Sequence, residues 1–134
     1  MARSLLKEEI LLVHSILVKE FGSHSLPSHL PIREEALNYL IDVVDSDMLG
    51  NPLYPEIHQK AGVYLFNILA DQIFPMANQR TAFGICLLFL KMNHCRLHKS
   101  LNHMEFVHFI QAISADKHSL KEVQEWFKYM ITPL

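Results

Sequence analysis

Residues 71–82 combine side chains that can bind a phosphate group. The segment lies between two apolar, helix-like runs, and Pro75 separates them because its ring cannot continue a helix. A new helix is expected to begin at about Asn78, where unpaired N–H groups and the helix dipole favour an anion. Asn78 would cap the turn, Arg80 would offer a fork of donors to phosphate oxygens, and Phe74 would anchor the loop in the core.

A second group of residues has the chemistry of metal ligands. The chain has 9 histidines, and a cluster of them with one cysteine consists of His94, Cys95, His98, His103 and His108. Their spacing matches no standard pair of zinc ligands. We therefore expect surface and partly buried histidines, and no metal site is predicted.

The elements that must position these residues are helices, because apolar residues recur with helical periodicity along most of the chain. Six helices are expected, over residues 4–21, from after Pro31 to Val44, and over 56–72, 78–93, 102–115 and 119–131. Residues 78–93 are apolar almost all round, which is typical of a helix at the centre of a bundle. The sequence therefore predicts an all-α fold, a compact bundle of about six helices around a central apolar helix.

Local signals indicate where these helices begin and end. Ser4 is an expected N-cap, Ser119 and Glu122 have the spacing of a capping box, and Gly22 would end the first helix. Residues 23–31 read as a polar loop, residues 45–55 as a second loop, and residues 95–99 as a short, extended connection.

Composition limits the class of protein. The chain has 134 residues, of which 50% are hydrophobic, which predicts a single domain over residues 1–134. The net charge is −2 and the two signs are mixed, so neither nucleic acid nor a membrane surface is an expected partner. Two cysteines and no evident signal peptide favour a reducing cytoplasm, and Cys86 is expected to be a small core residue.

The segment Asp-Gln-Ile-Phe-Pro-Met-Ala-Asn-Gln-Arg-Thr-Ala resembles the active-site motif of the Fic/Doc family. That motif reads His-x-Phe-x-Asp-Gly/Ala-Asn-Lys/Gly-Arg, and the Doc branch continues with Thr-Ala. The residues in register with the motif are Phe74, Ala77, Asn78, Arg80, Thr81 and Ala82. Three positions differ, because Gln72 replaces the histidine, Met76 the acidic residue and Gln79 the lysine.

The resemblance extends over most of the chain. Residues 51–55, the apolar helix that follows them, and the Leu-Leu-Phe-Leu-Lys-Met-Asn sequence of residues 87–93 are similar to segments of Doc-type proteins. Residues 8–22, with a histidine in their middle, are similar to the Doc N-terminal helix. The resemblance also implies that residues 100–106 and the loop around Asn51 flank the cleft.

The resemblance implies a transferase site that has lost its chemical groups. In the family, the histidine is the general base, the acidic residue helps to hold Mg²⁺ on the nucleotide, and the lysine binds phosphate. Gln72 has no useful pKa, Met76 is a poor ligand for a hard cation, and Gln79 carries no charge. The expected ligand is ATP or another nucleotide, without a firm Mg²⁺ site.

Two hypotheses follow from these residues. The first is a Doc-like relative of a toxin module, inactive or altered as a phospho- or nucleotidyl-transferase, that still binds phosphate through residues 74–80. An antitoxin or a protein target would then be its partner. The second is a non-enzymatic helical module that binds a protein and carries a vestigial site. A transferase that acts through other residues is a third alternative, and binding that depends on Arg80 separates the first hypothesis from the second.

Overall fold

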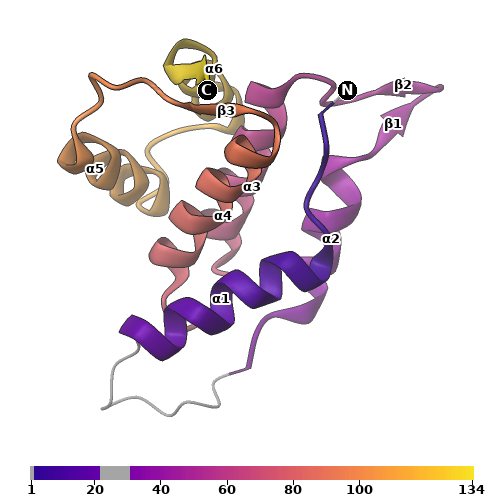
Figure 1. Ribbon diagram of the computed structural model, residues 1–134. Coiled ribbons are helices and arrows are strands. Elements are labelled where there is room, and N and C mark those ends of the chain that lie inside the picture. Colours follow the sequence, from indigo (N-terminus) through magenta and orange to yellow (C-terminus); the bar gives the residue numbers. More distant parts are fainter. Residues whose placement is uncertain (1, 22–30) are drawn as a thin grey trace.

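The computed structural model describes residues 2–21 and 31–134, and within them it contains six α-helices and four short strands. The helices are α1 (Lys7–Phe21), α2 (Glu34–Val44), α3 (Ile57–Asp71), α4 (Asn78–Met92), α5 (His103–Ser114) and α6 (Leu120–Met130). The strands are β1 (Asp47–Met48), β2 (Asn51–Pro52), β3 (Cys95–Leu97) and β4 (Ile131–Pro133). The predicted all-α bundle is confirmed (Figure 1). The predicted helix end at Gly22 and the loop at 23–30 lie outside the described residues.

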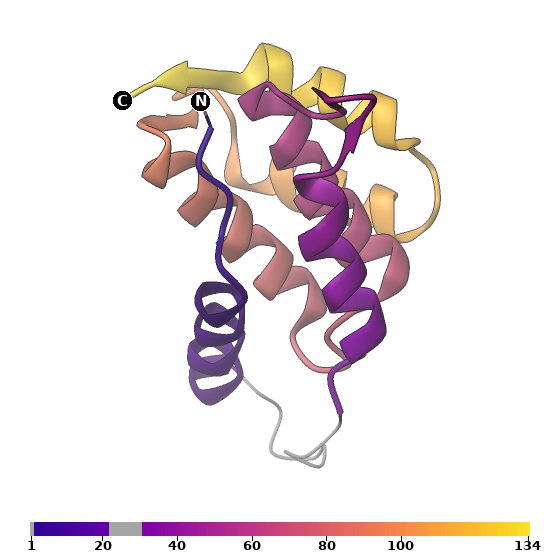
Figure 2. The same ribbon diagram turned by 90° about the vertical axis from the view of Figure 1, so that its right-hand side faces the viewer.

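The helix at the centre of the bundle is α3. It packs against α2, α4, α5 and α6, and it buries all six residues from Lys60 to Leu65 (Figures 1 and 2). The sequence indicated α4 instead, but Leu87 on that helix is 40% exposed. α3 can be surrounded by other helices because Gly62 has no side chain. The backbone of α6 therefore approaches α3 closely around Gln124.

Two helix starts follow from local capping, and one does not. The predicted capping box of α6 is confirmed, because the Glu122 N–H donates to Ser119 Oγ at 3.2 Å and the Ser119 N–H to Glu122 Oε1 at 2.8 Å. Asn102 caps α5 through the Met104 N–H, 2.7 Å away. The prediction that Ser4 caps α1 is wrong, since α1 begins at Lys7 and Ser4 donates instead to Asp45 Oδ1 at 2.5 Å.

Residues 2–6 run without helical structure from the end of α4 towards α1 and contact the middle of α3. The Arg3 N–H donates to Asn93 Oδ1 at 2.6 Å, and the Leu5 N–H donates to the Tyr64 hydroxyl at 2.9 Å. Burial raises the pKa of Tyr64 to about 12, so this hydroxyl stays protonated at neutral pH. These long-range bonds outweigh the local preference for a helix that begins at Ser4.

The strands form two small antiparallel ribbons. β1 and β2 are joined by Leu49 and Gly50, which both have positive φ, 52° and 84°, as a tight hairpin turn requires. β3 pairs with β4, so the connection predicted over residues 95–99 is extended at its start. The β1–β2 ribbon lies at the N-terminal end of α3, whereas the motif segment lies at its C-terminal end (Figures 1 and 2). Asn51 is therefore at the opposite end of α3 from the motif.

No helix in the described part of the chain has both the length and the apolar character needed to cross a membrane. The buried core combines residues from all six helices and from the segment between α3 and α4. Cys86 is fully buried in it, and burial raises the pKa of its thiol, which confirms its expected role as a small core residue.

Candidate functional site

The motif residues form a tight turn from Gln72 to Ala77 that joins α3 to α4. Gln72 ends α3 with φ 45°, and Ala77 precedes α4 with φ 57°. The backbone of both residues is in the left-handed region. For a residue other than glycine this conformation costs on the order of 1 kcal/mol or more. Such a conformation persists only where surrounding contacts enforce it.

Asn78 supplies two of those contacts. Its Oδ1 accepts the Phe74 N–H at 3.1 Å, and its Nδ2 donates to the carbonyl oxygen of Ile68 at 3.0 Å. The side chain therefore holds the turn, while the N-cap position of α4 belongs to Ala77. Phe74 is fully buried, as the sequence predicted for an anchor of this loop.

Two residues distant in sequence support the same turn. The Arg33 N–H donates to the carbonyl oxygen of Ile73 at 2.9 Å, and its guanidinium donates to that of Asp71 at 2.7 Å. The His14 ring stacks on Phe74 with centroids 4.3 Å apart. No sequence signal placed Arg33 or His14 at the motif, because the packing of α1 and α2 brings them there.

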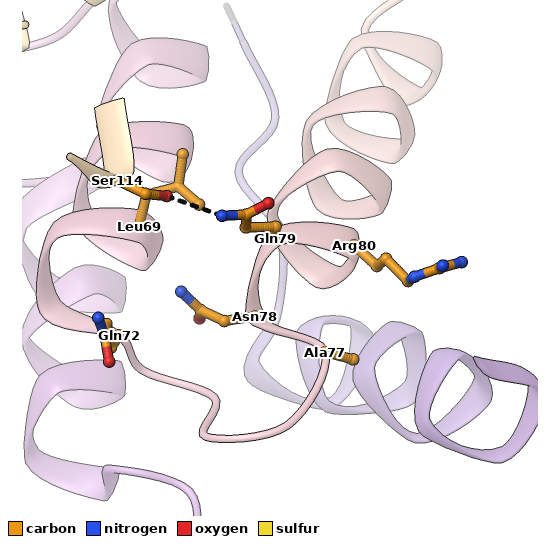
Figure 3. Close-up of a pocket in the computed structure, with 7 residues that line it drawn as sticks. All are labelled: Leu69, Gln72, Ala77, Asn78, Gln79, Arg80 and Ser114. Atoms are coloured by element: carbon orange, nitrogen blue, oxygen red, sulfur yellow. Dashed lines mark hydrogen bonds between the residues drawn. The ribbon is translucent and has the colours of Figure 1, made fainter. Parts of the chain in front are cut away.

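A cavity of about 410 Å³ lies beside the turn. We call it the motif cavity; its lining residues are Leu69, Gln72, Ala77, Asn78, Gln79, Arg80 and Ser114. Five of these were predicted site residues, and Leu69 and Ser114 were not. Figure 3 shows that the lining residues come from the end of α3, the turn, the start of α4 and the end of α5, with Gln79 Nε2 donating to Ser114 Oγ at 3.4 Å.

Four of the motif residues, Phe74, Met76, Thr81 and Ala82, do not line this cavity. Phe74 is buried behind the turn, and Met76 is only 6% exposed. Gln72, Gln79 and Arg80 are exposed, and the Arg80 side chain points away from Ser114 and Asn78 in Figure 3. Phe74 thus shapes the site from inside, and Gln72 and Gln79 present amides at its surface.

The electrostatics of the motif cavity favour an anion over a cation. None of the described residues that line it is Asp or Glu, and Arg80 is among them. The first N–H groups of α4 point along the helix axis towards this end, where the helix dipole is positive. Within the described segments, no group of three His, Cys, Asp or Glu side chains could hold a metal ion.

The histidine cluster of the sequence is spread over the surface. His94, His98, His103 and His108 are exposed, and Cys95 is half-buried in β3. His98 Nδ1 accepts the Ser100 N–H at 3.1 Å, which is a local turn contact. The four histidines therefore lie on the surface, within the expectation of surface and partly buried histidines.

A second cavity, of about 560 Å³, adjoins the first. We call it the apolar groove; its lining residues are Leu17, Gln79, Arg80, Phe83, Gly84, Leu87, His103, Val107 and Ile110. It lies between α1, α4 and α5, and Gln79 and Arg80 line both cavities. His103 belongs to the segment 100–106 that the resemblance predicted beside the cleft.

Comparison with known proteins adds no further assignment. No protein-family model and no curated protein matches the chain.

Proposed function

We propose that this chain is a Doc-like helical domain that binds a phosphate-bearing ligand, ATP or another nucleotide, in the motif cavity. We also propose that it transfers a phosphate or nucleotidyl group poorly or not at all. The observation that carries the proposal is the cavity itself, because Gln72, Ala77, Asn78, Gln79 and Arg80 line a single space at the start of α4.

The charge of that space supports an anionic ligand. A helix N-terminus binds phosphate through N–H groups and a favourable dipole. Arg80 adds a positive charge at the edge of the cavity, although its guanidinium points away from Asn78 and Ser114 in Figure 3. A carboxylate in the lining would oppose such a ligand, and the described lining residues include none. A strained turn at Gln72 and Ala77 is also typical of a functional site, where contacts maintain an unfavourable backbone.

The proposed loss of catalysis rests on three side chains. Gln72 lines the cavity where a general base would be needed, and an amide cannot accept a proton there, which costs about 10²–10⁴-fold in rate. Met76 is buried and offers a thioether in place of a carboxylate. Gln79 is uncharged and interacts with Ser114. Mg²⁺ is therefore not expected to strengthen binding greatly.

The test is a calorimetric titration with ATP, with and without Mg²⁺, of the unaltered chain, Arg80→Ala and Lys91→Ala. Lys91 is an exposed cation in the last turn of α4, so its removal is a matched control for charge. We expect Arg80→Ala to weaken binding by about tenfold and Lys91→Ala to leave it unchanged. The proposal fails if the unaltered chain binds no ATP at millimolar concentration.

A second candidate function is protein binding through the apolar groove, and the exposed Leu87 beside Phe83 favours it. The occupant would be an amphipathic helix, as the antitoxin implied by the Fic/Doc resemblance would supply. Leu87→Glu should abolish copurification with a coexpressed product of an adjacent gene, while ATP affinity stays unchanged. ATP binding without any such partner would favour the first function alone.

A further inference from the structure

His14 lies in the middle of α1, where it contacts both sides of the motif turn. Its ring stacks on Phe74 with centroids 4.3 Å and planes 26° apart, and its Nδ1 lies 3.1 Å from Thr81 Oγ1. Phe74 and Thr81 are both fully buried, and His14 is half-buried. One side chain of α1 thus connects two buried residues that lie on either side of Ala77.

This connection spans one of the two strained positions of the turn. Ala77 adopts φ 57°, and the first backbone bond of α4 runs from the Thr81 N–H to the Ala77 carbonyl oxygen at 2.8 Å. Relaxation of Ala77 towards ordinary backbone angles would move Thr81 relative to Phe74. The movement would break either the stack on His14 or its hydrogen bond, so both contacts oppose it.

We propose that His14 is a positioning residue of the motif cavity, which holds the first turn of α4 and Phe74 in a fixed relation. The proposal rests on the proposed function, since it concerns the same phosphate site. His14 lines neither the motif cavity nor the apolar groove, so it acts only through Phe74 and Thr81. Its effect on a ligand would be preorganisation: the N–H groups of residues 78–80 stay aimed at one point.

The neutral form of the ring suits this role. Burial lowers the pKa of His14 below its ordinary value near 6.5, so the stacked ring is uncharged at neutral pH. The Thr81 hydroxyl can donate to Nδ1 or accept from it, so either neutral tautomer keeps the bond.

Four variants separate this role from general support of α1. His14→Ala removes both contacts, His14→Phe keeps the ring and removes the nitrogens, and Thr81→Val removes only the hydroxyl. Val13→Ala is the control, because Val13 packs one turn further along α4, where its Cγ1 would lie 3.2 Å from a Cβ at Gly84. It loosens the α1–α4 contact without touching the turn.

The first readout needs no ligand. It is hydrogen exchange at the amides of Ile73, Phe74 and Thr81, each of which donates a bond within or next to the turn. Relative to Val13→Ala, we expect His14→Ala to speed this exchange by about tenfold, with His14→Phe between the two. Thr81→Val should add little when His14 is already alanine, since the two residues share one bond. Equal exchange in His14→Ala and Val13→Ala would overturn the proposal.

The second readout is the affinity for ATP of the same variants. We expect His14→Ala to weaken binding by about 5- to 20-fold relative to Val13→Ala, and His14→Phe to recover part of the loss. If the unaltered chain does not bind ATP, the proposed function fails, and the exchange experiment still decides the role of His14. If exchange changes and affinity does not, His14 holds the turn but does not position the site, and the proposal is wrong.

Discussion

Asn78 donates its side-chain amide to the carbonyl oxygen of Ile68 across 3.0 Å, which ties the first residue of α4 to the last full turn of α3. The same side chain accepts the Phe74 N–H at 3.1 Å. Asn78 therefore belongs to the frame of the turn as well as to the lining of the motif cavity.

Asn78→Ala should destabilise the fold by about 1–3 kcal/mol, because it leaves the Phe74 N–H without its acceptor. It also removes one donor to the Ile68 carbonyl oxygen, which still accepts from the N–H groups of Gln72 and Ile73. Gln79→Ala is the neighbouring control, and we expect a change of only about 0.5 kcal/mol since that side chain is exposed. Urea denaturation measures both. Equal effects would show that the two bonds of Asn78 contribute nothing to the turn.

Gly62 and Gly84 should respond differently to alanine. A Cβ at Gly62 would lie 3.0 Å from the Cα and 3.1 Å from the backbone nitrogen of Gln124, so α3 and α6 must separate, at a cost of about 1–3 kcal/mol. A Cβ at Gly84 would meet only the flexible ends of Leu17 and Val13, both at 3.2 Å. There the better helix propensity of alanine, about 1 kcal/mol, offsets the crowding. Thermal unfolding of the two variants tests the contrast, and a lower melting temperature for Gly84→Ala than for Gly62→Ala would contradict it.

The lowered pKa of His14 predicts a loss of stability in acid. The unfolded chain binds a proton on His14 near pH 6.5, whereas the folded chain resists it until the pH is lower. The contribution is therefore complete above pH 6.5 and decreases as the pH falls through 6.5 towards the folded pKa. The measurement is the free energy of unfolding from pH 8 to pH 5 for the unaltered chain and His14→Phe.

Their difference isolates His14, because the chain has 9 histidines and the other eight are present in both proteins. We expect the stability of the unaltered chain to fall relative to His14→Phe as the pH decreases. A constant difference over this range would show that the folded and unfolded pKa values of His14 are the same.

Gln72→His should not restore full transferase activity. The new imidazole would stand at the end of α3 beside the motif cavity, but Met76 and Gln79 still lack the carboxylate and the positive charge. Adding Met76→Asp places a carboxylate at a position that is 6% exposed, which costs about 2 kcal/mol or more in stability. Transfer of label from ATP to a protein hydroxyl is the assay. Full activity of the single variant would mean that the metal and lysine positions are dispensable.

The features predicted correctly from the sequence are those that depend on residues close together in the chain. Ser119 and Glu122 are three residues apart, so their capping box forms by local geometry alone, and the motif residues 77–80 share one cavity because they are contiguous. Ser4 shows the limit, since its local signal for an N-cap loses to a bond with Asp45. Long-range pairing of that kind has no signature in the segment itself.

The same limit explains the site residues that the sequence missed. Ser114 reaches the motif cavity because α5 ends beside α4, and His14 reaches Phe74 because α1 packs across the turn. The pairing of β3 with β4 joins residues 95–97 to 131–133, and strands of three residues are too short to show alternation. Each of these contacts depends on how the elements pack in the bundle.

The turn between α3 and α4 contains residues that hold its shape and residues that face outward. Phe74, Asn78 and His14 hold its shape through buried contacts, whereas Gln72 and Gln79 face outward and hold nothing but a long bond to Ser114. Substitution at the outward positions therefore leaves the shape of the turn unchanged. Side chains at Gln72 and Gln79 can therefore change without loss of the fold, whereas the buried position of Met76 lacks this freedom.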